Sequence, residues 1–251
     1  MTDAPRPGIR VAIVDDEPLA RSVIREYLAA LGGVEIVAEC ANGFEAVKVV
    51  SELHPDLLFL DVQMPKLDGF EVLELVGDDV AVVFVTAYDQ YAIRAFDVHA
   101  VDYLLKPFSA ERLGEALARA RDRLERGERA PVAQLAAAAR PPASRGGRVL
   151  VRDGSRVHVL PVEKINYVQA QDDYVSYRYE GKDYLKEQTL AEAEAALDPA
   201  KFVRIHRSYL LNLECLARIE SGERENRFAI LTDGRRLPVS RAGYARLSKR
   251  L

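Results

Sequence analysis

The chain has 251 residues, of which 49% are hydrophobic and 29% charged, a composition that fits a globular protein with one large domain or two ordinary ones. It has no stretch of the roughly 20 apolar residues that span a bilayer, and residues 1–7 lack the apolar segment of a secretory signal, so we expect a cytoplasmic protein without a membrane partner. The net charge of −4 argues against nucleic-acid binding, but residues 1–108 carry 8 basic and 19 acidic residues whereas residues 148–251 carry 19 basic and 15 acidic, so we expect different partners for the two halves.

The first 125 residues alternate short apolar runs with segments of helical periodicity. The runs are rich in β-branched residues and lack strict alternation, as in strands that are covered on both faces. They occupy residues 10–14, 34–40, 56–60, 80–86 and 101–105. Segments of helical spacing lie between them and suggest five strand–helix units. Such units predict an α/β fold with a doubly wound, five-stranded parallel sheet.

A change of composition separates the two halves. A predicted helix at residues 109–126 is followed by a stretch rich in Ala, Pro, Gly and Ser. Beyond it the apolar period becomes two, which predicts a mainly β domain. The predicted strands are at 149–151, 157–160, 165–168, 174–179, 227–232 and 236–239, with short helices at 190–197 and at the C-terminus. We therefore expect one domain at 8–126, a flexible linker at 127–147 and a second domain at 148–251.

Polar residues follow four of the five predicted strands of the first half. Asp15 and Asp16 follow the first strand, Asp61 the third, Thr86 the fourth and Lys106 the fifth. The carboxyl ends of parallel strands share one edge of the sheet, so these side chains should converge. Clustered carboxylates suit Mg²⁺, and a carboxylate can itself accept a phosphoryl group. Taken singly, each residue has a simpler explanation, as a helix cap, a loop residue, a strand end or a solvated charge.

Together with their flanking residues, these positions resemble the receiver domain of response regulators. The matching motifs are Val14-Asp15-Asp16-Glu17-Pro18, Leu60-Asp61-Val62-Gln63-Met64-Pro65, Asp68-Gly69, Val85-Thr86-Ala87 and Tyr103-Leu104-Leu105-Lys106-Pro107. The resemblance implies a flavodoxin-like fold and phosphotransfer from a sensor histidine kinase to Asp61.

The same resemblance implies roles for the other residues of the pocket. Mg²⁺ would be bound directly by Asp16, Asp61 and the backbone carbonyl of Gln63, and through water by Asp15. Lys106 and Thr86 would contact the phosphoryl group, and Thr86 and Tyr103 would move together when it arrives. Slow self-dephosphorylation is the only catalysis that we expect, so the chain would not be an enzyme.

Arginines of the second half form two compact clusters, at residues 203–212 and 235–241. Arginine binds phosphates and can bridge two acceptors of guanine in the major groove. A solvated, arginine-rich β surface would have the same composition. No helix-turn-helix pattern, metal-ligand spacing or basic heptad region is evident, so the charges alone leave DNA binding undecided.

The second half resembles the LytTR output domain, so the chain as a whole resembles a two-component response regulator. The matching segments are residues 202–212, 231–234 and 237–241, with Tyr174 and residues 186–190. The resemblance implies a mainly β fold that inserts loops into successive major grooves of duplex DNA. Arg207 and Arg241 are then the expected base contacts, with Tyr174 at a third contact. The second choices are His206, Ser208, Asn212 and Ser240. The neighbouring Asp172 and Asp173 depart from this picture, since two acids repel DNA.

The resulting hypothesis is a transcription regulator in which phosphorylation of Asp61 promotes homodimerisation through a face around Ala92, Ile93, Phe96 and Arg112. Dimerisation would hold two output domains on adjacent DNA half-sites. One alternative is a signalling protein whose second domain binds a protein or RNA. Another is a phosphohydrolase with an Asp nucleophile, which would need a further acid/base carboxylate that the sequence does not identify.

Overall fold

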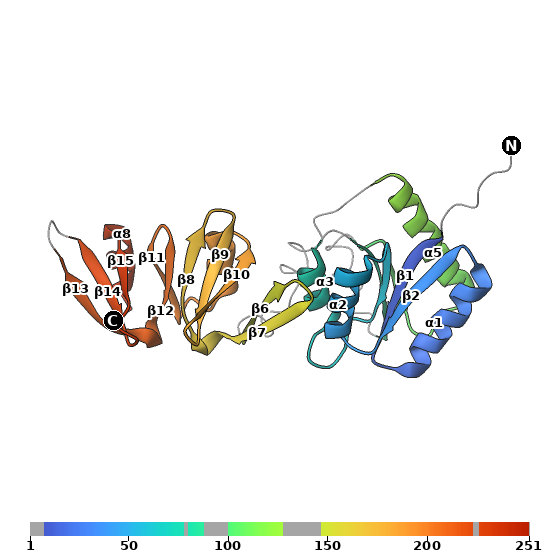
Figure 1. The fold of residues 1–251 in the computed structure, drawn as a ribbon, viewed down its shortest axis with the longest axis horizontal. Helices are drawn as coiled ribbons and strands as arrows, with labels where there is room; N and C mark the ends of the chain where they lie inside the picture. The colour runs from blue at the N-terminus through green and yellow to red at the C-terminus, as the bar shows by residue number, and fades with distance from the viewer. Residues whose placement is uncertain (1–7, 78–79, 88–99, 128–146, 223–225, 251) are drawn as a thin grey trace. The chain divides into compact units, whose positions relative to one another are not determined.

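The structure, a computed structural model, describes residues 8–77, 80–87, 100–127, 147–222 and 226–250. The chain forms two compact units, which are described separately (Figure 1). The first contains the elements up to Glu125, and the second is built from the elements that begin at Arg148. Most of the predicted linker and residues 88–99, with Ala92, Ile93 and Phe96, lie outside the described residues.

The first unit contains a five-stranded parallel sheet with the strand order β2-β1-β3-β4-β5. The strands are β1 (Ile9–Val14), β2 (Val34–Cys40), β3 (Leu57–Leu60), β4 (Ala81–Thr86) and β5 (Asp102–Leu105). Each lies within one residue of its predicted bounds, and the doubly wound sheet is confirmed. The order places β1, where the polar motifs begin, in the interior of the sheet beside β3.

Four helices of the described residues cover the two faces of this sheet (Figure 1). They are α1 (Pro18–Leu31), α2 (Gly43–Leu53), α3 (Gly69–Val76) and α5 (Ala110–Glu125). Apolar residues of α1 and α5 share one core with the inward side chains of β1, β3 and β4. Three of these helices begin at a capping side chain, which accepts a hydrogen bond from a backbone N–H of the first turn. The caps are Asn42 for α2, Asp68 for α3 and Ser109 for α5. These caps fix where the loops at the carboxyl edge end.

The second unit is mainly β, as predicted, and contains three antiparallel sheets or hairpins. The central sheet has the order β10-β9-β8-β12-β11, and the other two are β13-β14-β15 and β6-β7. Its strands are β6 (Arg148–Asp153), β7 (Arg156–Pro161), β8 (Ile165–Gln171), β9 (Tyr174–Tyr179), β10 (Lys182–Glu187), β11 (Phe202–His206), β12 (Tyr209–Asn212), β13 (Leu216–Ser221), β14 (Arg227–Leu231) and β15 (Arg236–Val239). The helices are α7 (Leu190–Ala196) and α8 (Arg241–Leu247), with 3₁₀ turns at Val162–Lys164 and Leu213–Cys215.

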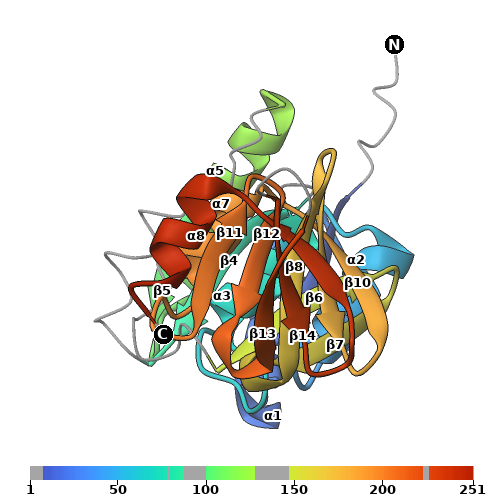
Figure 2. The same cartoon turned by 90° about the vertical axis from the view of Figure 1, so that its left-hand side faces the viewer.

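The central sheet has an apolar core on each face. Val168 and Leu210 belong to the core shared with α7 and the β6–β7 hairpin. Their chain neighbours Tyr167 and Leu211 belong to the core shared with α8 and the β13–β14–β15 sheet. This alternation follows from the two-residue period of a strand. Figure 2 shows α8 beside β11 on this second face, where the C-terminal arginines are brought to the sheet.

Four strands of the second unit were not predicted: β10, β11, β12 and β13. The first arginine cluster, to which no secondary structure was assigned, is the β11–β12 hairpin, with Arg207 and Ser208 as its turn. Along β11, buried Val203 and Ile205 alternate with half-exposed Arg204 and His206. The charged residues of this alternation are the exposed side of a strand.

Candidate functional site

The acidic residues of the first unit converge at the carboxyl edge of the sheet. The carboxylates of Asp15, Asp16 and Asp61 each offer an oxygen within 4.8 Å of the others. Strand register causes this proximity, because Val14 is paired with Leu60 and the N–H of Asp61 donates to the Val14 carbonyl at 2.8 Å. Asp15 and Asp61 are buried, whereas Asp16 is half-buried. Three of the predicted site residues are therefore brought together.

Lys106 reaches into this cluster from the end of β5. Its Nζ lies 2.6 Å from Oδ2 of Asp15 and 3.0 Å from Oδ2 of Asp61. Burial disfavours the ammonium, but the hydrogen bond to Asp15 and the charge of Asp61 outweigh it and raise the pKa of Lys106. Burial also raises the pKa of Asp15, against the opposing effects of Lys106 and of the Glu17 N–H. Lys106 thus stays charged at neutral pH and holds both carboxylates.

The donor set of this pocket fits a hard divalent cation. The described residues place three carboxylates but a single ammonium there, an excess of negative charge that a second cation would relieve. Carboxylate oxygens are the ligands that Mg²⁺ prefers. Gln63 lies in the same loop, where its N–H donates to Oδ1 of Asp61 at 3.1 Å. Asp15, Asp16 and Asp61 could therefore hold Mg²⁺, and the carbonyl of Gln63 stays a predicted ligand.

Thr86 carries a buried polar atom that lacks a partner. Its side chain is fully buried at the end of β4, and within the described residues Oγ1 makes no hydrogen bond. An unsatisfied buried hydroxyl is costly, so native proteins keep such a group where a ligand supplies its partner. An oxyanion beside Asp61 would be such a ligand. Tyr103, the predicted companion of Thr86, is half-buried on the neighbouring strand β5.

Gly69 allows α3 to start directly behind the pocket. A Cβ at this position would lie 2.5 Å from the backbone oxygen of Asp61, which is closer than a real Cβ approaches. The N–H of Gly69 donates to the Val62 carbonyl at 2.9 Å. The Asp68-Gly69 motif therefore sets the backbone of the acidic loop, with Asp68 as the helix cap.

A network around Asp102 was missed in the sequence. Arg112 of α5 binds the Asp102 carboxylate with two hydrogen bonds of 2.7 Å, and Arg119 adds a third of 2.8 Å. Arg112 also donates to the carbonyl of Tyr103 at 3.0 Å. Burial alone would raise the pKa of Asp102, but the hydrogen bonds and charges of the two arginines prevail and lower it. The network fixes α5 to β5, next to Tyr103 and Lys106.

Replacing Asp102 with asparagine is expected to destabilise the first unit in a pH-dependent way. A lowered folded-state pKa contributes stability above the ordinary value of 3.8, and the contribution is lost as the pH falls through the folded-state value. We expect a cost of about 2 kcal/mol at about pH 7, and a smaller cost at about pH 3. Urea unfolding of both chains at the two pH values measures this. An equal cost at both would show that Asp102 acts by packing alone.

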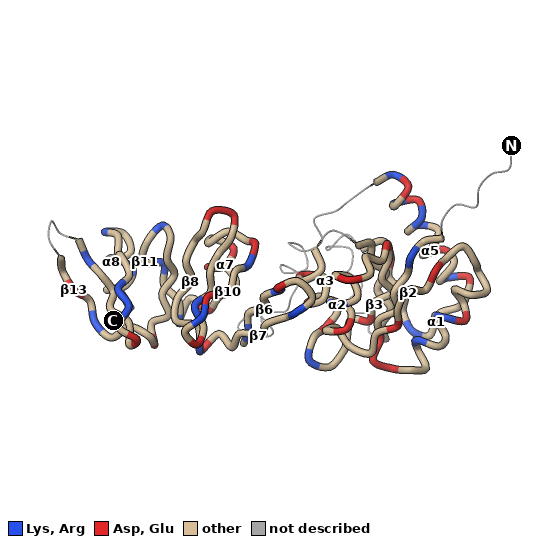
Figure 3. Tube along the Cα trace, viewed as in Figure 1, with Lys and Arg blue, Asp and Glu red and all other residues tan. Residues whose placement is uncertain are grey.

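The second unit gathers the predicted DNA contacts Arg207, Ser208 and Tyr174 at one end of its central sheet, whereas Asn212 lies at the opposite end of β12. Tyr209 is paired with Gln169, and the Ala170 N–H donates to the Ser208 carbonyl at 2.9 Å. The β11–β12 turn with Arg207 therefore lies at the same end of the sheet as the β8–β9 turn that precedes Tyr174. Tyr174 is 46% exposed there. Figure 3 shows basic residues near the ends of β11 and α8, and acidic residues at the β8–β9 turn.

Ser240 joins α8 to this end of the sheet. Its N–H and its Oγ both donate to the carbonyl of Ile205, at 2.9 and 3.1 Å, and its Oγ accepts from the Gly243 N–H at 3.0 Å. These bonds place the exposed Arg241, the first residue of α8, next to β11. Ser240 was predicted as a DNA contact, and its hydroxyl is instead engaged in capping α8 and fixing it to the sheet.

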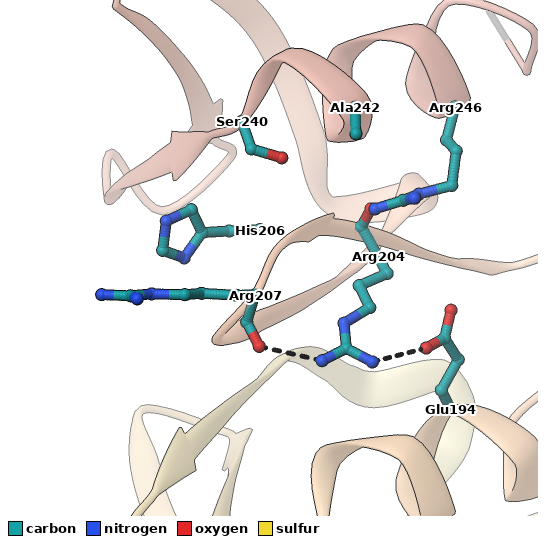
Figure 4. Close-up of a pocket in the computed structure, with 7 residues that line it drawn as sticks. All are labelled: Glu194, Arg204, His206, Arg207, Ser240, Ala242 and Arg246. Atoms are coloured by element: carbon teal, nitrogen blue, oxygen red, sulfur yellow. Dashed lines mark hydrogen bonds and ion pairs between the residues drawn. The ribbon is translucent and has the colours of Figure 1, made fainter.

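An open pocket of about 560 Å³ lies between β11, α7 and α8 (Figure 4). It is lined by Glu194, Arg204, His206, Arg207, Ser240, Ala242 and Arg246. Burial and the charge of Arg207 lower the pKa of His206, and its Nδ1 accepts from the Ser208 N–H at 3.2 Å. His206 is therefore neutral at physiological pH, with its proton on Nε2 as a hydrogen-bond donor. Among the described residues the exposed Arg207 guanidinium has no carboxylate partner.

Comparison with known proteins gives the same two-part organisation. The family model of the response regulator receiver domain matches residues 11–118, and that of the LytTr DNA-binding domain matches residues 155–251. The chain belongs to the LytTR response regulators. The transcriptional regulatory protein BtsR of Escherichia coli is 38% identical over 238 residues, which are 93% of this chain and 95% of BtsR.

Two further relatives are similar to this LytTR response regulator. A response regulatory protein of Yersinia pestis is 36% identical over 249 residues, which are 97% of this chain and 98% of the relative. The solved receiver domain of AraT from Geobacillus stearothermophilus is 34% identical, with a TM-score of 0.43, and covers 47% of this chain and 96% of that domain. No helix among the described residues of the regulator is long and apolar enough to cross a membrane.

One predicted DNA contact of the regulator is wrong. Asn212 is fully buried at the end of β12. Its amide nitrogen donates to the Ile165 carbonyl at 2.8 Å, and its Oδ1 accepts from the Glu214 N–H at 3.0 Å. Both amide atoms thus satisfy backbone groups inside the protein, and Asn212 has a structural role. Asn212 was predicted as a contact because it belongs to a basic segment that resembles the LytTR domain. Such a resemblance does not reveal to which side of a strand a side chain points.

Proposed function

We propose that this response regulator accepts a phosphoryl group from a sensor histidine kinase on Asp61 in the cytoplasm. The convergence of three carboxylates with Lys106, near the buried Thr86 hydroxyl that has no hydrogen-bond partner among the described residues, supports this proposal. In the transfer, an oxygen of the Asp61 carboxylate forms a bond to phosphorus, and the bond from phosphorus to the kinase histidine breaks with its electron pair left on that nitrogen. That nitrogen takes up a proton from solvent, so the products are an aspartyl phosphate and a neutral histidine.

The residues around Asp61 account for the charge that develops during transfer. Lys106, which already contacts Asp61 Oδ2 at 3.0 Å, would turn its hydrogen bond to a phosphoryl oxygen. Thr86 Oγ1 would donate to another, which supplies the partner that the hydroxyl lacks. Mg²⁺ bound by Asp15, Asp16 and Asp61 would neutralise the remaining negative charge. Within the described residues no further carboxylate joins this cluster, and self-dephosphorylation is the only turnover that we propose.

We further propose that phosphorylation controls binding of the second unit to duplex DNA as a homodimer. A phosphoryl group adds about two negative charges and three acceptor oxygens, so the chain around Thr86 and Tyr103 must adjust. Two chains held together would place two LytTR domains on adjacent half-sites, which raises the effective concentration of the second. Arg207 and Arg241, exposed on neighbouring elements, are the proposed base contacts, and Tyr174 with His206 and Ser208 lies at the same edge.

Selection from a random pool of duplex DNA tests the proposed function. The regulator, activated with beryllofluoride and Mg²⁺, should enrich paired motifs about one helical turn apart. Arg207→Ala and Arg241→Ala should each abolish the enrichment, since base-edge hydrogen bonds specify sequence. If no duplex is enriched although Asp61 separately accepts phosphate, a protein or RNA partner is favoured.

A further inference from the structure

Arg204 occupies the centre of the pocket between the two proposed base-reading elements (Figure 4). Its Nη1 donates to Oε2 of Glu194 at 3.1 Å, and its Nη2 donates to the carbonyl of Arg207 at 3.0 Å. Its own carbonyl accepts from Nε of Arg246 at 2.9 Å. Arg204 is therefore bonded to α7 and the β11–β12 turn through its side chain, and to α8 through its backbone.

These contacts distinguish Arg204 from Arg207. The Arg204 side chain is 28% exposed and both of its terminal nitrogens donate to protein atoms. Arg207 is exposed, and its guanidinium points away from the guanidinium of Arg204, which binds the Arg207 carbonyl (Figure 4). A phosphate contact needs guanidinium donors that face solvent, and those of Arg204 are directed inward. The inward direction indicates a role in holding the turn.

We propose that Arg204 is a positioning residue for sequence reading, which fixes the backbone of Arg207 against the α8 segment that carries Arg241. This inference rests on the proposed DNA binding. Reading a base edge requires two hydrogen bonds in a fixed geometry, whereas attraction to phosphates tolerates displacement. Replacement of Arg204 with the equally charged lysine should therefore weaken binding to a preferred sequence and leave binding to other sequences unchanged.

Glu194 belongs to the same hydrogen-bonded arrangement as Arg204. Its carboxylate is the partner that orients the Arg204 guanidinium from α7. As an acid in a DNA-binding surface it lowers the general attraction to phosphates, so its presence there is explained by orientation of Arg204. Glu194→Gln removes a negative charge, Arg204→Ala removes a positive one, and Arg204→Lys changes none. Positioning predicts that all three lower specificity, and a charge effect predicts opposite changes for the first two.

The test compares two duplexes bound by the full-length regulator: one recovered by selection with the parent chain, and a scrambled duplex of the same composition. Arg204→Lys should bind the selected duplex about ten-fold more weakly, as expected from the loss of one charge-assisted hydrogen bond. It should bind the scrambled duplex as the parent does. Arg204→Ala should keep the parent's dependence of affinity on salt. Glu194→Gln should lower the ratio of the two affinities while binding the scrambled duplex more tightly.

Matched controls separate this inference from folding and from the proposed function. Arg218→Ala removes an exposed arginine of β13 that pairs with Glu220, and should leave the ratio unchanged. Thermal unfolding of each variant shows whether the second unit is folded, and Arg204→Lys preserves the apolar stem. Binding of the selected duplex by Arg204→Lys with the affinity of the parent chain would overturn the inference. So would an equal loss of affinity for both duplexes in Arg204→Ala, if the slope of log affinity against log salt also became shallower by about 0.9. If the parent chain selects no duplex, the proposed function fails first.

Discussion

Substitution of Asp61 with asparagine is expected to abolish phosphoryl uptake while the regulator stays folded. Asparagine has the shape of aspartate, and its amide oxygen can still accept the 3.1 Å hydrogen bond from Gln63. It lacks the carboxylate oxygen that must form the bond to phosphorus. It also removes one of three clustered negative charges, and the lower repulsion offsets the loss of the 3.0 Å ion pair with Lys106, so the chain should stay folded. Intact mass after incubation with acetyl phosphate and Mg²⁺ measures the uptake.

Asp56 provides a matched control for this experiment. It directly precedes β3, whereas Asp61 directly follows it, so the two acids lie at opposite ends of one strand. Asp56 is exposed and accepts a hydrogen bond from the Arg10 N–H at 2.8 Å. Asp56→Asn should be phosphorylated to the same extent as the parent chain, and chelation of Mg²⁺ should abolish uptake in both. Full uptake by Asp61→Asn would refute Asp61 as the acceptor.

The first unit was predictable because its central strands β1, β3 and β4 are largely buried on both faces. Leu57, Leu58, Phe59 and Leu60 are each fully buried, so the apolar run itself marks the strand. The carboxyl ends of parallel strands share one edge of the sheet, so the polar residues that follow each run lie on that edge. This is how Asp61 was associated with the acids after β1. The pairing of Asp102 with Arg112 could not be found this way, since either residue alone is an ordinary charge of a strand or helix.

The second unit was less predictable because the missed strands β10, β11 and β13 have a polar side and β12 begins at a polar turn. Arg204 and His206 alternate with buried Val203 and Ile205, so a cluster of charge concealed a strand. Hydrogen bonds between residues far apart in the chain also decide which polar residues are available. The bond from Asn212 to Ile165 spans 47 residues, and the one from Ser240 to Ile205 spans 35. No local spacing encodes such partners.

Replacement of Gly243 with alanine is expected to disrupt the second unit and its binding to DNA. The Gly243 position in α8 lies directly against the backbone of Ile205, and an added Cβ would collide with the Ile205 carbonyl oxygen. That oxygen also accepts the two hydrogen bonds from Ser240 that fix Arg241 next to β11. The Ile205 oxygen is held at a bulge of β11 by the two bonds from Ser240, so the added Cβ must push α8 away and these bonds must lengthen or break. We expect a loss of about 3 kcal/mol or more.

Thermal unfolding and binding to the selected duplex together measure this effect. The transition of the second unit should fall by about 10 °C or more, and affinity for the selected duplex should fall even below the new transition, because Arg241 is displaced from Arg207. Gly147→Ala is the matched control, since a Cβ at Gly147 would meet no atom within 4 Å among the described residues. It should leave both properties unchanged. Parent-like stability and affinity in Gly243→Ala would show that α8 does not need this close contact, and that the placement of Arg241 depends on other bonds.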